Sequence, residues 1–342
     1  MNGRFCLRFS IIWAIAAVCL GLFALSYTAT PPKLSLAFPL TCKPNENCWI
    51  VTYADHDRSP GIRDYTCGHR TYDGHNGIDI GIGNMRVMEA GVSVIAAADG
   101  VVKGIRNNEP DISIHVRGQE AVKGRECGNG VMLMHANGYS TQYCHLKKGS
   151  VSVKPGQQVR AGETLGLVGL SGKTELPHLH FTVRHDNHII DPFTGLEFSE
   201  TCKSSAVQSP LWETSVLSQL QYKPVLIYSA GIADYIPKVE EIEVEDSQVT
   251  NLSADSPVIV LWAILYGVEA GDVLSLQVVG PDGRILVDNT TVLTQRNVRY
   301  YKYLGKRKKD TSWAPGLYRG RVILSRKPGN IEEKHSVQFH IF

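Results

Sequence analysis

Gly169–Phe181, G-L-S-G-K-T-E-L-P-H-L-H-F, ends in two histidines, His178 and His180, that are separated by one residue. Residues two apart on a β-strand point to the same face, so both imidazoles would enter one cleft. Roughly a hundred residues upstream lies a second cluster of ligand-type side chains, His75-Asn76-Gly77-Ile78-Asp79. His145 lies between the two clusters, in Tyr143-Cys144-His145-Leu146. The order of these histidines and the carboxylate points to one shared site.

Two histidines and a carboxylate can supply a catalytic zinc ion with three protein ligands and leave a fourth position for water. His75 and Asp79 are four residues apart, but Gly77 and the flanking glycines argue against a helix. A glycine between two ligands lets the backbone bend, so that both side chains reach one ion. For this cluster taken alone, a buried histidine paired with an aspartate is the alternative.

The composition favours an all-β protein of two domains. The chain has 342 residues, of which 43% are hydrophobic and 20% charged, an ordinary globular balance for that length. It contains 32 Gly and 16 Pro, with many short apolar runs and few long amphipathic helical patterns. Short segments at 149–159 and 162–169 are punctuated by glycine, which is typical of small barrels and sandwiches.

The N-terminus has the pattern of an export signal. Arg4 and Arg8 precede an apolar run from Ile11 to Leu25, which is short for a membrane span. We therefore expect residues 1–26 to be a signal peptide, with an uncleaved anchor as the alternative. Export permits disulfides, and an even number of cysteines predicts three bridges with fifteen possible pairings. The six cysteines beyond the leader are Cys42, Cys48, Cys67, Cys127, Cys144 and Cys202.

The charge balance gives no support to nucleic acid as a partner. Removing residues 1–26 takes away Arg4 and Arg8 and no acid, which leaves 33 basic and 33 acidic residues. The basic run Lys306–Lys309 is expected to be a solvated loop, with contact to an anionic polymer as the alternative. A membrane contact is expected only through an uncleaved leader.

Composition shifts divide the chain into segments. Strand patterns at 258–265, 273–279, 316–324 and 336–341, with a turn at 280–283, predict an immunoglobulin-like β-sandwich at the C-terminus. The polar stretch 107–128 is expected to be a surface insertion, and 212–220 a short helix. The expected ranges are a proline-rich extended segment at 27–47, a disulfide-bearing domain at 48–203, a linker at 204–246 and the sandwich at 247–342.

One motif is rejected. Ser171-Gly172-Lys173-Thr174 looks like the end of a phosphate-binding loop, but that loop requires a glycine where Leu167 stands.

Taken in order, the motifs resemble the lysostaphin-type (LytM) zinc endopeptidases of family M23, over about residues 75–193. Each motif is weak alone, whereas the full series in order is specific. The matching segments are His75–Asp79, 91–102, Thr141–Leu146, 156–172, His178–Phe181 and Asp191-Pro192. The resemblance implies a small barrel-sandwich-like M23 peptidase domain.

The resemblance also implies the roles of five residues. His75, Asp79 and His180 would be the ligands of one zinc ion per catalytic domain. His178 would take a proton from the attacking water as a general base, and His145 would stabilise the oxyanion. The chain lacks the helical H-E-x-x-H pattern of other zinc peptidases.

The function expected from this resemblance is an exported bacterial zinc metalloendopeptidase, in the periplasm or secreted, that hydrolyses peptide cross-links between peptidoglycan stem peptides. Two alternatives stay open. One is a secreted protease or bacteriolysin that acts on glycine-rich peptides, and the other is a non-catalytic wall-binding activator of another hydrolase. Retention of all five site positions argues against the activator. The C-terminal sandwich carries no ligand cluster and is expected to be a spacer or a wall-targeting module.

Overall fold

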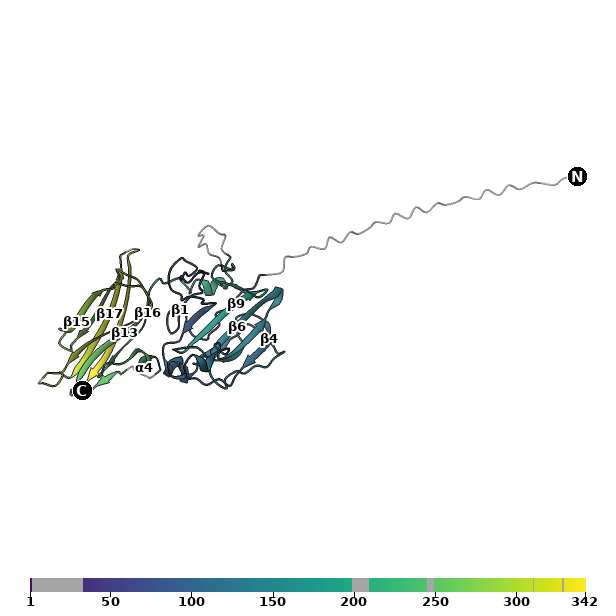
Figure 1. Ribbon diagram of the computed structural model, residues 1–342. Coiled ribbons are helices and arrows are strands. Elements are labelled where there is room, and N and C mark those ends of the chain that lie inside the picture. Colours follow the sequence, from purple (N-terminus) through teal and green to yellow (C-terminus); the bar gives the residue numbers. More distant parts are fainter. Residues whose placement is uncertain (2–32, 199–208, 245–248, 310, 328) are drawn as a thin grey trace. The chain divides into compact units, whose positions relative to one another are not determined.

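The computed structural model describes residues 1, 33–198, 209–244, 249–309, 311–327 and 329–342 (Figure 1). The leader expected over residues 1–26 lies, apart from Met1, outside the described residues. In the part of the chain that is described, no helix combines the length and the apolar character that crossing a membrane requires.

The first domain contains ten strands and short helices. The strands are β1 (Trp49–Thr52), β2 (Ile78–Gly81), β3 (Ser93–Ile95), β4 (Gly100–Arg106), β5 (Asn129–Met134), β6 (Tyr139–Leu146), β7 (Gln158–Val159), β8 (Thr164–Leu167), β9 (His178–His185) and β10 (His188–Ile190). The helices are α1 (Met85–Ala90), α2 (Ile114–Arg117), η1 (Glu120–Val122), η2 (Ala136–Gly138) and α3 (Thr214–Leu217).

One antiparallel sheet, in the order β1-β2-β9-β6-β5-β4-β7 with β10 beside β9, organises this domain (Figure 1). Strand β9 lies between β2 and β6, and the register pairs His180 with Asp79 on one side and with Cys144 on the other. Strands β3 and β8 form a separate antiparallel pair. The central position of β9 therefore brings three distant segments of sequence to one point.

The strands follow the expected alternation. On β9, Leu179, Phe181 and Val183 are buried in the hydrophobic core, while the residues between them face the opposite side. Between β5 and β6, Asn137 and Gly138 have positive φ angles of 58° and 76°, which tight hairpin connections require. The all-β prediction is confirmed.

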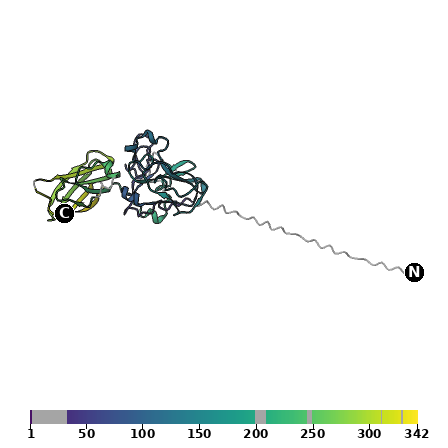
Figure 2. The same cartoon turned by 90° about the horizontal axis from the view of Figure 1, so that it is seen from below.

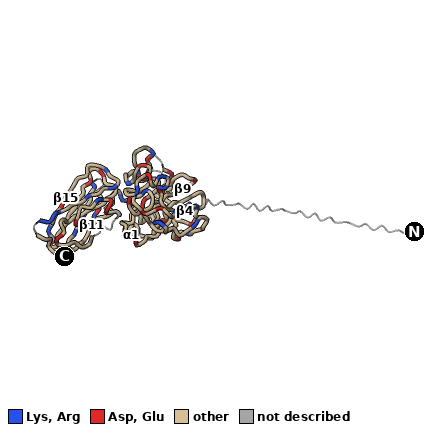
Figure 3. Tube along the Cα trace, turned by 60° about the horizontal axis from the view of Figure 1, so that its bottom comes forward, with Lys and Arg blue, Asp and Glu red and all other residues tan. Residues whose placement is uncertain are grey.

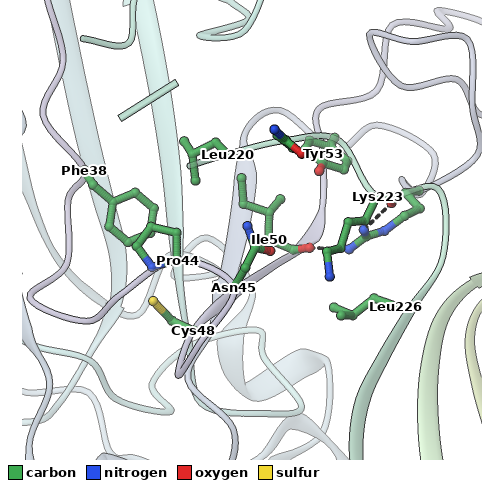
Figure 4. Close-up of a pocket in the computed structure, with 11 residues that line it drawn as sticks. Phe38, Pro44, Asn45, Cys48, Ile50, Tyr53, Leu220, Lys223 and Leu226 are labelled. Carbon is green, nitrogen blue, oxygen red and sulfur yellow. Dashed lines mark hydrogen bonds between the residues drawn. The ribbon is translucent and has the colours of Figure 1, made fainter. Parts of the chain in front are cut away.

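The proline-rich N-terminal segment packs into this domain. Leu36, Phe38 and Leu40 belong to the core, and the Ile95 N–H donates to the Pro39 carbonyl at 2.9 Å. Figure 4 shows the side chains of Phe38, Pro44 and Leu220 around Ile50, at a cavity of about 10 Å³ that is too small for a ligand. The segment is therefore part of the hydrophobic core of this domain and contacts strand β3.

Two disulfides are present in this domain, Cys42–Cys48 and Cys127–Cys144. The prediction of bridges is confirmed for these pairs, while Cys202 lies outside the described residues. The second bridge ties the end of the 107–128 insertion to β6.

The 107–128 insertion is packed more closely than its polar sequence predicts. Ile114 and Val122 are buried. Glu109 accepts hydrogen bonds from Arg117 Nη2 at 2.6 Å and from Arg125 Nη1 at 3.0 Å. This carboxylate joins the two ends of the insertion, which explains how a mostly polar segment keeps a defined path.

The C-terminal domain is a β-sandwich of two sheets, seen from below in Figure 2. One sheet has the order β11-β13-β16 and the other β12-β18-β17-β14-β15. Their shared core is built from alternating residues, such as Leu274, Leu276 and Val278 on β14. The elements are β11 (Leu226–Ala233), α4 (Val239–Val244), β12 (Asn251–Leu252), β13 (Val258–Val268), β14 (Val273–Val279), β15 (Ile285–Val292), β16 (Asn297–Arg307), β17 (Gly316–Arg326) and β18 (Ile331–Ile341).

Two features differ from the expected segmentation. Strand β11 lies inside the range 204–246 that is expected to be a linker, and it pairs with β13 along seven residue positions. Lys306 and Arg307 end strand β16 and are not part of a loop.

Basic and acidic residues are interspersed along the trace in both domains (Figure 3).

Candidate active site

Three ligand-type side chains meet where β2 and β9 pair. His75 Nε2 lies 3.2 Å from Asp79 Oδ1 and 3.2 Å from His180 Nδ1. His180 Nδ1 is 2.9 Å from the same Asp79 oxygen. His75 and Asp79 are buried, and the His180 side chain is 13% exposed, so the group opens to solvent on the His180 side.

The remaining ring nitrogens decide what this group can bind. His75 Nδ1 lies 2.6 Å from the Tyr53 carbonyl oxygen, which can only accept, so Nδ1 carries the proton. His180 Nε2 faces the oxygens of Asn76 and Thr182 at 3.1 and 3.0 Å, where it donates. Both rings therefore turn an unprotonated nitrogen towards the carboxylate. Three electron-rich atoms this close fit a cation, and two nitrogens with one oxygen suit zinc.

Asp79 is oriented by β1. The Thr52 hydroxyl donates to Asp79 Oδ2 at 2.5 Å, and the strand register places the two residues opposite each other. Burial opposes the charged form, but the surrounding histidines hold the pKa of the Asp79 carboxyl well below its usual range. The carboxylate is thus ionised and has one oxygen occupied by Thr52 and the other directed at the histidines.

Two further histidines flank this group. His178 Nδ1 donates to the Leu176 carbonyl at 2.9 Å, and His145 Nδ1 donates to the Ser171 carbonyl at 2.8 Å. The two rings lie 4.7 Å apart between centroids. Because both Nδ1 atoms are engaged with backbone carbonyls, each ring has only its Nε2 atom left to exchange a proton.

The two rings differ in their electrostatic surroundings. Burial would lower the pKa of His178, but the Asp79 carboxylate, 3.4 Å from its Nε2, raises that pKa above its ordinary value. Burial and the neighbouring histidines place the pKa of His145 well below its ordinary value.

His145 has a left-handed backbone, with φ of 64°, which is costly for a residue with a side chain. Its N–H donates to the Cys127 carbonyl at 2.8 Å, and its carbonyl accepts from the Gly169 N–H at 2.9 Å. The Cys127–Cys144 disulfide fixes the first of these partners. The bridge therefore supports the conformation that directs His145 into the site.

Two grooves meet at this site. One, of about 400 Å³, includes Thr52, Asp79, His145, Thr174 and His178 in its lining. The other, of about 200 Å³, includes His75, His180 and Thr182. His145, Tyr72 and Lys173 line both. Among the described residues, none from 33–47 lines either groove, so this part of the N-terminal segment does not cover the site.

The structure brings together all five residues singled out in the sequence. Sequence reasoning missed the groups that orient them, above all Thr52, Asn76 and Thr182. Thr182 follows His180 by two residues on one strand, so alternation would have identified it. The pairing of Thr52 with Asp79 depends on the register of β1 and β2 and leaves no signal in the sequence.

Thr52→Val is expected to weaken zinc binding by roughly 10- to 100-fold, because removal of a hydrogen bond that orients a metal ligand typically costs this much. A competition titration of the chain with a chromogenic zinc chelator measures the effect. Thr52→Ser keeps the hydroxyl and is expected to bind zinc almost as tightly as the wild type. Equal affinities for Thr52→Val and the wild type would show that Asp79 does not depend on this bond.

Comparison with known proteins finds one family over part of the first domain. Residues 73–192 match the model of Peptidase family M23, which confirms the resemblance stated from the motifs. The chain is 36% identical over 107 residues to the peptidoglycan DD-endopeptidase ShyA of Vibrio cholerae, covering 31% of this chain and 19% of that protein. It is 30% identical over 159 residues to the DD-carboxypeptidase/endopeptidase Mpg of Neisseria meningitidis, covering 45% of this chain and 31% of that protein.

Each of these matches spans less than a third of the relative's length. Among solved structures, a zinc-containing peptidase from Vibrio cholerae is 25% identical, with a TM-score of 0.27, covering 42% of this chain and 38% of that one.

Proposed function

Because residues 73–192 are a peptidase M23 domain, we propose that this protein is an exported bacterial zinc metalloendopeptidase that hydrolyses peptide cross-links between peptidoglycan stem peptides. The observation that carries the proposal is the meeting of His75, Asp79 and His180 within 3.2 Å, beside two histidines anchored through Nδ1. ShyA and Mpg, whose names state DD-endopeptidase or endopeptidase activity, support the reaction class.

In this proposal His75 Nε2, Asp79 Oδ1 and His180 Nδ1 hold one zinc ion. When bound, zinc would supply a Lewis acid there and would make the attacking water more acidic. The protein's contribution is a set of pre-oriented ligands, since Tyr53, Thr52 and the Asn76–Thr182 pair occupy the atoms that face away from the group.

The two flanking histidines handle protons. His178 Nε2 accepts the proton of the attacking water, because its Nδ1 is already committed to the Leu176 carbonyl. His145 has its Nδ1 committed to Ser171, and burial lowers the pKa of the resting ring. In the proposal Nε2 gains a proton as negative charge develops beside it, because a nearby anion favours the charged imidazole, and this N–H donates to the oxyanion of the tetrahedral intermediate. The peptide carbonyl would approach the Nε2 atoms of the two rings, which lie side by side with centroids 4.7 Å apart.

The proposal also covers where the protein acts and which domain carries out catalysis. Two disulfides in the first domain support an oxidising compartment outside the cytoplasm, either the periplasm or the exterior. We assign catalysis to residues 48–203 and treat the β-sandwich as a separate module, with β11 as part of it.

The chain from residue 27 onward, assayed with a purified cross-linked muropeptide dimer, tests the proposal. We expect one zinc ion per chain, conversion of dimer to monomers, loss of cleavage with a chelator and recovery with added zinc. Cleavage of a glycine-rich peptide but not of the dimer would replace the proposal with a bacteriolysin. A zinc-loaded chain that cleaves neither substrate would identify a non-catalytic activator.

A further inference from the structure

The smaller groove runs along strand β9 away from the metal group. Its lining includes His180, Thr182 and Arg184, which alternate along one face of β9. On the neighbouring strand, Cys144 and Gln142 also line it, and the register places them opposite His180 and Thr182. The groove floor is therefore a two-stranded ladder that begins at a ligand-type histidine and ends at an arginine.

Arg184 is charged, and no ion-pair partner for it lies in the part of the chain that the structure describes. Its Nη1 atom is buried and has no hydrogen-bond partner among the described residues. Burial lowers the pKa of the guanidinium, although an arginine stays protonated in proteins. A desolvated cationic nitrogen without an acceptor is costly to the folded protein and is normally paired.

The acidic residue in the described lining of this groove has other partners. Glu126 Oε1 accepts from the Gly124 N–H at 2.8 Å. Backbone hydrogen bonds, together with Lys173 and Arg106, hold the pKa of Glu126 below its ordinary value. Among the described residues, no carboxylate forms an ion pair with Arg184, so none of them supplies the anion.

The spacing indicates where that anion would come from. Arg184 is four residues beyond His180, which corresponds to about 13 Å along a strand. An extended peptide advances by the same amount per residue, so a substrate lying along β9 would present a group about three to four residues from the bond at the metal group. Arg184 lines the groove and is only partly buried, so its guanidinium is within reach of a carboxylate there, and a guanidinium suits a planar carboxylate better than an ammonium does.

We propose that Arg184 is a specificity-determining residue that binds a free carboxylate of the substrate peptide, about three to four residues from the scissile bond. This inference rests on the proposed peptidase function. Through Arg184, the enzyme would prefer peptides that carry a free side-chain or terminal carboxylate to neutral peptides of the same length.

The test compares a cross-linked muropeptide dimer with the same dimer amidated at one free carboxylate at a time. For the wild-type chain, amidation of the recognised carboxylate is expected to lower kcat/KM by about 10- to 100-fold, chiefly through KM. Arg184→Gln is expected to show the same loss on the free dimer and little further loss on amidation. Arg184→Lys is expected to restore part of the activity, because it restores the charge but not the fork.

Arg160→Gln, at an exposed position after β7, is the matched control and is expected to behave as the wild type. Wild-type cleavage that is insensitive to every amidation would overturn the role of Arg184 and leave the proposed function intact. This arm needs no variant, so a misfolded Arg184→Gln chain cannot obscure it.

Calorimetric binding of a linear stem tetrapeptide, free and amidated, separates the two proposals. Suppose the wild-type chain cleaves nothing, but the tetrapeptide binds it more weakly after amidation, or binds Arg184→Gln more weakly. That result would support carboxylate recognition and reject the peptidase. Binding that is unaffected by either change would reject the recognition.

Discussion

His180→Ala is expected to lose both bound zinc and peptidase activity, whereas His178→Ala keeps the zinc and loses activity by about 10²- to 10⁴-fold. The two residues lie two positions apart on β9, and their ring nitrogens have different partners. His180 presents Nδ1 to Asp79 and His75, while His178 Nδ1 is held by a backbone carbonyl. Removing the first deletes a ligand, and removing the second deletes a proton acceptor.

Zinc content by mass spectrometry and cleavage of the muropeptide dimer measure the two effects separately. His185→Ala is a control on the same strand, because its side chain is 41% exposed and lies outside the site. The control is expected to retain zinc and activity. Full activity in His178→Ala would show that another group accepts the proton, and full zinc in His180→Ala would remove this residue from the ligand set.

Gly172→Ala is expected to destabilise the protein by about 3 kcal/mol or more, whereas Gly156→Ala costs about 1 to 2 kcal/mol. Both glycines have φ near +85°, so both substitutions carry the same left-handed strain. A Cβ at Gly172 would lie 2.3 Å from the Glu126 carbonyl oxygen and 2.4 Å from the Gly128 nitrogen, both backbone atoms. A Cβ at Gly156 meets nothing within 4 Å.

The midpoint of denaturant unfolding, at unchanged m-value, measures the difference in free energy of unfolding. Gly172→Ala is also expected to lower activity, because the adjacent Ser171 carbonyl accepts the hydrogen bond from His145 Nδ1. Equal midpoints for the two variants would mean that the 126–128 segment moves away without cost. The glycine that imitates a phosphate-binding loop thus has a packing role.

Much of the fold and of the candidate site could be predicted from sequence. Alternation on a strand placed His178 and His180 on one face, and His75 and Asp79 converge as the short spacing suggested. The role of Gly77 is close approach and not a bend, because a Cβ there would lie 2.6 Å from the Phe181 carbonyl oxygen. The order of the motifs identified the family, which the match over 73–192 confirms. These features are local, so residue identity and the two-residue period of a strand are sufficient to define them.

Other features could not be predicted, because they depend on contacts between distant segments. The polar stretch 107–128 shows no periodicity, yet Glu109, Arg117 and Arg125 give it a fixed path. Strand β11 was assigned to a linker range, and only its pairing with β13 makes it part of the sandwich. In both cases a partner far along the chain decides the conformation.

By itself, the sequence determined which side chains are available for chemistry and which of them share a strand face. Only the tertiary structure decided how they are oriented and which remain unpaired. Thr52 reaches Asp79 because β1 and β2 pair in one register. Over the described ranges Arg184 Nη1 has no partner, since Glu126, the acidic residue of its groove, accepts from the Gly124 N–H. Register is fixed by matching the hydrophobic faces of two strands and by the turns between them, so it depends on both strands and cannot be read from one alone.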